Sequence, residues 1–320
     1  MIDFRYHLVS IIAVFLALAL GLVVGASALR GSVTSELRGQ AAQIGKDNQN
    51  LRVQKRAVDQ LNAYDSQVMD GVSPQVVDGQ LKGESVVFIE APGADDQMRA
   101  KTADIVGKAG ARISGYVTLG DKYLDGNQLA TLSELTDQLK PAGLEFPADA
   151  TPYDRAAIEL AAVLVTKQAS SSGQEDPAAG QVLAGFKTAN FLTYSGQPAT
   201  RATLAIVIAP AAASNDKNAD ARNKALVAIP VALSQYGNGT VTAGNTDAAA
   251  DGGMIKAIRD ESKAESHGST VDTADASAGR LTTVFALSFA AKQGKTGDYG
   301  IGSGVDGPMP TPVPTALKKK

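Results

Sequence analysis

An uncharged, apolar run from Leu8 to Leu29 stands almost at the start of the chain and constrains everything that follows. As a helix, this run would rise about 1.5 Å per residue and extend roughly 33 Å, whereas the hydrocarbon core of a bilayer is about 30 Å thick. The run therefore predicts a single-pass transmembrane anchor, which occupies residues 1–30 together with the short segment before it.

A cleaved secretory signal is the alternative interpretation, because Ala26-Ser27-Ala28 has the small-x-small form of a cleavage site. Two features argue against cleavage. The segment before the run carries one basic side chain, Arg5, and the run is longer than the roughly 7 to 15 apolar residues that are usual in a signal. We therefore expect the anchor to be retained in the cell membrane.

Small residues recur at every fourth position of the anchor, at Ala13, Ala17, Gly21 and Gly25. A helix face of this kind lets a second backbone approach closely, so Ala17, Gly21 and Gly25 are candidates for transmembrane packing. Alanine and glycine are also frequent in transmembrane helices in general, and the pattern alone leaves both explanations open.

Apolar side chains then recur at every seventh position, at Leu37, Ile44, Leu51 and Val58. This spacing is typical of a coiled coil and predicts that residues 31–72 form a helix that self-associates or binds a partner. The other seam position carries the polar residues Gln40, Asp47 and Gln54, which weaken a zipper while they fix its register. A single amphipathic helix lying along the following domain remains the alternative.

The composition excludes several classes of protein. The chain has no cysteine, which removes disulfide scaffolds, thiolate metal sites and cysteine nucleophiles. Its formal net charge is -3 and its aromatic content is 5%, so no basic patch or stacking platform points to nucleic acid as a partner.

The remainder of the chain alternates between apolar strand patterns and amphipathic helix patterns. Ser73-Pro74 is expected to end the long helix, because the residue before a proline disfavours helical geometry. The expected strands cover residues 85–91, 113–119, 202–209 and 240–243, and the expected helices cover residues 95–109, 221–236 and 254–261, with a helical stretch at 128–167. This order predicts a mostly parallel, Rossmann-like α/β body at residues 73–300, in one sheet or two.

Polar, low-complexity stretches at residues 169–180 and 211–221 are expected to be exposed loops. The Pro-rich, Lys-ending segment 301–320 is expected to stay disordered.

Catalytic motifs are missing from this pattern. The turn after the first strand, Pro92-Gly93, lacks the G-x-G-x-x-G spacing of a dinucleotide site, and Asp95-Asp96 is expected to cap the following helix. His267 is expected in a surface loop, and Asp272 and Asp275 in an exposed, solvated loop. We therefore predict no catalytic, cofactor-binding or metal-ligating residues and no enzymatic activity.

Both ends of the chain carry more specific motifs. The start reads MIDFRYHLVS, followed by VFLALA at residues 14–19 and GLVVG at 21–25, and the far end carries STVD at 269–272, AGR at 278–280 and GDYG at 297–300. These motifs resemble the opening and closing sequences of the actinobacterial MctB family, which is named for copper transport. Corynebacterial members of that family include SteB, which acts with its membrane partner SteA in daughter-cell separation.

The resemblance implies a non-enzymatic envelope protein whose body lies outside the cell membrane, with a homo-oligomer and a SteA-like membrane protein as possible partners. The family name implies a component of copper transport or copper homeostasis as an alternative function. The residues do not favour copper coordination, because copper binds best to thiolate, thioether or imidazole ligands, and this chain has two histidines and five widely spaced methionines. A degenerate nucleotide-binding-like domain with an unrecognised activity is a further alternative.

Overall fold

The structure is a computed structural model that describes residues 4–212, 218–260 and 267–313. The chain falls into two compact units, Met1–Asp65 and Ser66–Lys320. The first unit holds the anchor and most of the heptad segment, and the second unit contains the end of that segment and the α/β body.

Helix α1 extends over Phe4–Val77. Its segment Arg5–Ala26 has a mean hydropathy of 2.9 and is the one stretch of the described chain that is long and apolar enough to cross a membrane. The expected break at Ser73-Pro74 is wrong, because Pro74 lies inside the helix. The Ser73 hydroxyl donates to the Met69 carbonyl at 2.5 Å, and the last turns of α1 are held by the body, where Ser73 and Val77 are buried.

A single sheet forms the centre of the body, with the strand order β3-β2-β1-β4-β5-β6-β7. All pairings are parallel except that of β3, which runs antiparallel to β2. The strands are β1 (Ser85–Glu90), β2 (Arg112–Leu119), β3 (Leu192–Gly196), β4 (Leu204–Ile208), β5 (Gly239–Ala243), β6 (Ser269–Val271) and β7 (Asp298–Tyr299). The predicted mostly parallel α/β class is confirmed, in one sheet.

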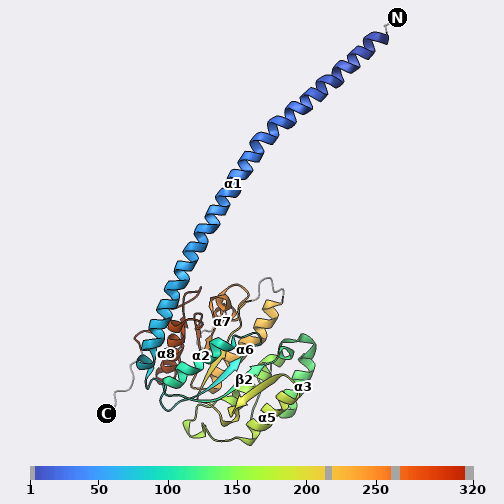
Figure 1. The fold of residues 1–320 in the computed structure, drawn as a ribbon. Coiled ribbons are helices and arrows are strands. Elements are labelled where there is room, and N and C mark those ends of the chain that lie inside the picture. The colour runs from blue at the N-terminus through green and yellow to red at the C-terminus, as the bar shows by residue number, and fades with distance from the viewer. Residues whose placement is uncertain (1–3, 213–217, 261–266, 314–320) are drawn as a thin grey trace. The chain divides into compact units, whose positions relative to one another are not determined.

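Helices cover both faces of this sheet (Figure 1). They are α2 (Asp96–Lys108), α3 (Leu129–Leu139), α4 (Pro152–Leu164), α5 (Pro177–Thr188), α6 (Ala219–Tyr236), α7 (Met254–Asp260) and α8 (Ser277–Gln293). Because side chains alternate along a strand, Val86 and Phe88 of β1 pack with α2 and α8, whereas Val87 and Ile89 pack with α4 and α6. The near-continuous apolar strands therefore reflect a sheet that is buried on both faces.

Four segments of the body differ from expectation. The stretch 169–180, expected as a loop, contains the start of α5, where the Asp176 carboxylate accepts from the amides of Ala178 and Ala179. Strand β3 and helix α8 were not expected. The segment expected to be disordered from residue 301 is bonded to the body as far as it is described, since the Asp306 amide donates to the Asp298 carbonyl at 2.7 Å; residues 314–320 lie outside the described residues.

Candidate functional site

The carboxyl ends of β1 and β4 mark the topological switch point, where open α/β sheets usually hold their ligands. The loops that follow these two strands touch here: a Cβ added to Gly93 would lie 3.7 Å from the Pro210 Cβ. The first turn of α2 is occupied by the Asp95 carboxylate, which accepts from the amides of Gln97 at 2.7 Å and Met98 at 3.3 Å. This is the predicted cap, and its negative charge would repel a phosphate from the helix terminus.

Glu90, at the end of β1, is buried beside the same edge of the sheet. The Arg99 Nε lies 3.0 Å from its carboxylate, and the Thr118 hydroxyl donates to the same oxygen at 3.3 Å. Burial raises the pKa of the Glu90 carboxyl, and the Arg99 guanidinium opposes that rise. The Glu90 carboxyl is thus paired within the fold, and this cluster has the character of a structural ion pair.

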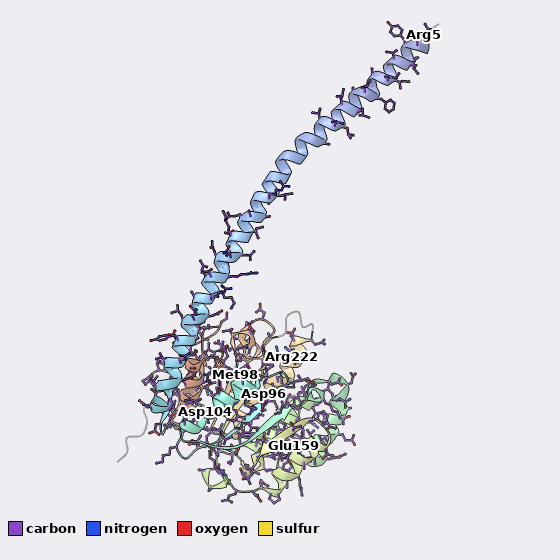
Figure 2. All side chains as sticks on the ribbon, viewed as in Figure 1. Arg5, Asp96, Met98, Asp104, Glu159 and Arg222 are labelled. Carbon is purple, nitrogen blue, oxygen red and sulfur yellow. The ribbon has the colours of Figure 1, made fainter. Side chains whose placement is uncertain are left out.

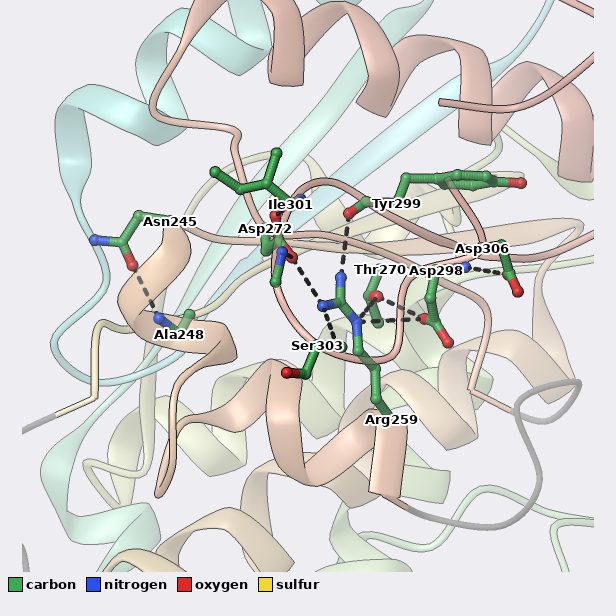
Figure 3. A network of polar contacts seen from close by, with 11 residues as sticks. Asn245, Ala248, Arg259, Thr270, Asp272, Asp298, Tyr299, Ile301, Ser303 and Asp306 are labelled. Atoms are coloured by element: carbon green, nitrogen blue, oxygen red, sulfur yellow. Dashed lines mark hydrogen bonds and ion pairs between the residues drawn. The ribbon is translucent and has the colours of Figure 1, made fainter. Parts of the chain in front are cut away.

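Asp272, which follows β6, is fully buried, so the expectation of a solvated loop is wrong for this residue (Figure 3). Its carboxylate accepts from the Arg259 Nη1 at 2.8 Å and from the amides of Ile301 and Gly302 at 2.9 Å each. Asp275 is exposed, as expected. The expected surface position of His267 is also wrong, because that side chain is 1% exposed.

Arg259 joins this carboxylate to the neighbouring strands. Its Nε donates to the Thr270 hydroxyl at 2.9 Å, and that hydroxyl donates to the Asp298 carboxylate at 2.5 Å (Figure 3). Arg259 Nη2 donates to the Tyr299 carbonyl at 3.1 Å. We call Arg259, Thr270, Asp272 and Asp298 the closing network, because it ties α7, β6 and β7 to the segment after residue 300.

The remaining motif of the far end, AGR at residues 278–280, is equally structural. Arg280 donates to the Asp275 carbonyl at 2.7 Å, to the Ser277 hydroxyl at 2.7 Å and to the Asp70 carboxylate of α1 at 3.3 Å. A Cβ at Gly279 would overlap the Thr273 carbonyl. The closing motifs thus hold the C-terminal part of the body and the end of α1 in place.

Metal-ligating groups are sparse where the structure can be described: no cluster of three or more His, Cys, Asp or Glu side chains is found within residues 4–212, 218–260 and 267–313. Two of the five methionines, Met98 and Met254, are buried in the apolar cores.

The heptad residues lie on α1, and their side chains are exposed. Leu37, Ile44, Leu51 and Val58 are between 53% and 61% exposed. Of the polar seam residues, Asp47 accepts from the Gln43 amide at 3.0 Å on the same helix.

In the anchor, Ala17 and Gly21 are exposed, and a Cβ added at Gly21 or Gly25 would meet nothing within 4 Å. Arg5 lies in the first turn of the helix, at the start of the apolar segment (Figure 2). The structure therefore places both predicted sets on one helix and leaves their apolar surface open.

Residues 1–310 match the sequence model of a family described as "Copper transport outer membrane protein, MctB". The chain belongs to the MctB family. Relatives named "Copper transporter MctB" from Mycobacterium tuberculosis and Mycobacterium bovis are each 30% identical over 311 residues, which cover 95% of this chain and 98% of theirs. The relative of that name from Mycobacterium leprae is 29% identical over 315 residues, with the same coverage.

The MctB match spans the anchor, the heptad segment and the α/β body, so the resemblance seen at the two ends of the sequence holds for almost the whole chain. Sequence reasoning missed Arg259 in this MctB-family protein. A signal for it exists at β6, where Thr270 within the strand and Asp272 directly after it stand in alternate positions, since buried polar side chains on one face require a partner.

Proposed function

We propose that this MctB-family protein is a non-enzymatic, single-pass membrane protein that assembles with a second copy through the heptad seam and presents its α/β body in the cell envelope. The main support for this proposal is the row of exposed apolar side chains on one uninterrupted helix, formed by Leu37, Ile44, Leu51 and Val58. A solitary helix would leave this row in water, whereas a partner with the same heptad spacing would cover it.

The energy available from the seam is moderate. Burying one such side chain is worth about 1.5 to 3 kcal/mol, so four residues from each of two helices can support a stable pair. Gln40 and Asp47 subtract from this gain, and they also fix the register of the two helices. The open face at Gly21 and Gly25 would let the same two helices pack within the membrane.

The switch point supports a non-enzymatic body. A nucleotide phosphate would meet the Asp95 carboxylate at the first turn of α2, where bound phosphates usually find free amides. Because corynebacterial members of this family include SteB, we propose that the assembled protein serves cell separation with a SteA-like membrane protein as its partner.

The seam is tested by replacing Ile44 and Leu51 together with Asp in the full-length protein in detergent. The matched control replaces Ala42 and Gln49 with Asp, which introduces the same charge on the opposite helix face. Light scattering and crosslinking should show a smaller particle for the seam variant and no change for the control. Persistent association of the seam variant, with Gly21 and Gly25 also changed to Leu, would place the contact in the body and refute the proposal.

Copper transport is the second candidate, and it is favoured by the name of the family and of its mycobacterial relatives. Soft thioether ligands are few here, and Met98 and Met254 are 4% and 1% exposed, so we expect no tight, stoichiometric copper site on one chain. Calorimetric titration of the full-length protein with copper checks this. A saturable copper site that is lost when His267 or Met254 is replaced would make copper transport the favoured function.

A further inference from the structure

Glu159 is a buried carboxyl group to which no other described residue offers a hydrogen bond. It lies on α4, in the helical part of the body (Figure 2), and its side chain is 0% exposed. Neither carboxyl oxygen has a hydrogen-bond partner among the described residues. A buried ionised carboxylate without a partner is strongly destabilising, so the group is stable here only as the neutral acid.

Among the residues that the structure describes, no cation forms an ion pair with Glu159. The buried residues of α5 and α6, which pack against α4, include no titratable side chain. From α3, Asp137 acts on Glu159, and its negative charge disfavours a second one nearby. Arg155, one turn earlier on α4, is engaged by Asp137 at 3.1 Å. Burial first and Asp137 second raise the pKa of Glu159 to about 8.

Helix α3 packs against this part of α4, since Asp137 of α3 pairs with Arg155 and its charge acts on Glu159. Its main packing partners are α4, α5 and the short 3-10 turn at Gly126–Gln128. No side chain caps its first turn. The Asp137–Arg155 ion pair that joins it to α4 is 59% and 31% exposed, and such pairs contribute little stability. Little therefore holds α3 in place besides its apolar contacts.

We propose that α3 is a proton-dependent cover, which lies closed over α4 while Glu159 carries its proton and lifts when Glu159 ionises. In this step the carboxylic acid releases its proton to solvent, and the carboxylate that remains gains water only if α3 moves away. Opening would uncover the outer faces of α4 and α5. A rise in pH would thus change the surface that the body presents.

Hydrogen exchange of the full-length protein in detergent tests this between pH 6 and pH 9, with rates corrected for the intrinsic effect of pH. With a pKa of 4.5 when open and about 8 when closed, the open fraction of α3 should rise about 50-fold from pH 6 to pH 8 and then level off. Amides of the central, fully buried strand β4 serve as the internal reference and should show no such rise.

Glu159→Gln should abolish the pH dependence of exchange in α3, whereas Glu134→Gln, which removes an exposed acid of α3, should leave it unchanged. Asp137→Asn retains Glu159 but removes the negative charge that raises its pKa, so the rise in α3 exchange should level off at a lower pH. If Glu159→Gln does not fold, the Asp137→Asn profile tests the proposal instead. An unchanged pH profile in Glu159→Gln, or in Asp137→Asn, would overturn the proposal, as would a wild-type α3 whose protection does not vary with pH.

Discussion

Asp272→Asn tests how strongly the closing network holds the C-terminal part of the body. The substitution keeps the shape of the side chain and removes its charge. Arg259, whose side chain is 2% exposed, would then lose its carboxylate at 2.8 Å and keep only the more distant Asp298 carboxylate at 3.8 Å. Breaking a buried ion pair from one side costs about 3 to 5 kcal/mol, because the remaining charge stays desolvated.

Two details set the expected value within that range. The amide oxygen that the substitution introduces can still accept one of the two backbone hydrogens from Ile301 and Gly302, and Arg259 keeps its bonds to the Thr270 hydroxyl and the Tyr299 carbonyl. We therefore expect the unfolding free energy to fall by about 3 kcal/mol, at the lower end.

Urea unfolding of the full-length protein in detergent, followed by the near-ultraviolet circular dichroism of its tyrosines, measures this fall. Asp275→Asn is the matched control, because Asp275 is exposed and its replacement should change the unfolding free energy by less than about 0.5 kcal/mol. If Asp272→Asn is as stable as this control, the buried pair does not hold the segment and the reasoning is refuted.

Two further substitutions and one protease treatment have expected outcomes. Gly300→Ala should destabilise the body and expose residues after 300 to protease, because Gly300 has φ +131° and a Cβ would overlap the Asp272 carboxylate; wild-type resistance would contradict this. Asp95→Ala should lower the unfolding free energy by about 1 kcal/mol through loss of the α2 cap, against a smaller fall for Asp96→Ala, which removes an exposed first-turn acid 3.7 Å from Arg99. Protease added to intact spheroplasts should digest the body if it lies outside the membrane, as the resemblance implies, and full protection would show the opposite orientation.

Local patterns predicted the first strand-helix-strand unit closely. Residues 85–91, 95–109 and 113–119 were expected, and the elements are Ser85–Glu90, Asp96–Lys108 and Arg112–Leu119. Strands that are buried on both faces appear in the sequence as continuous apolar runs. The helix between them is capped by Asp95, the residue directly before its first turn. Such signals are local, so the sequence alone is sufficient to find them.

Elements fixed by distant partners were not predictable in the same way. Strand β3 has the sequence LTYSG with three exposed residues, and it is a strand because β2 supplies its hydrogen bonds. Helix α8 is buried on most sides, so its sequence lacks the amphipathic pattern by which a surface helix is predicted. Asp272 is buried because Arg259, on a different element, is brought to it by the fold.

The strand order around β1 resembles that of dinucleotide-binding sheets, yet two residues of the first loop remove what a phosphate would bind. Pro92 has no backbone N–H, and Asp95 fills the first turn of α2 with its own carboxylate. Topology follows from which strands are apolar and how they are connected, whereas ligand binding follows from a few side chains at the strand ends. The proposed assembly accordingly rests on the apolar heptad seam, which no element of the single chain covers within the described residues, and not on a ligand at the sheet.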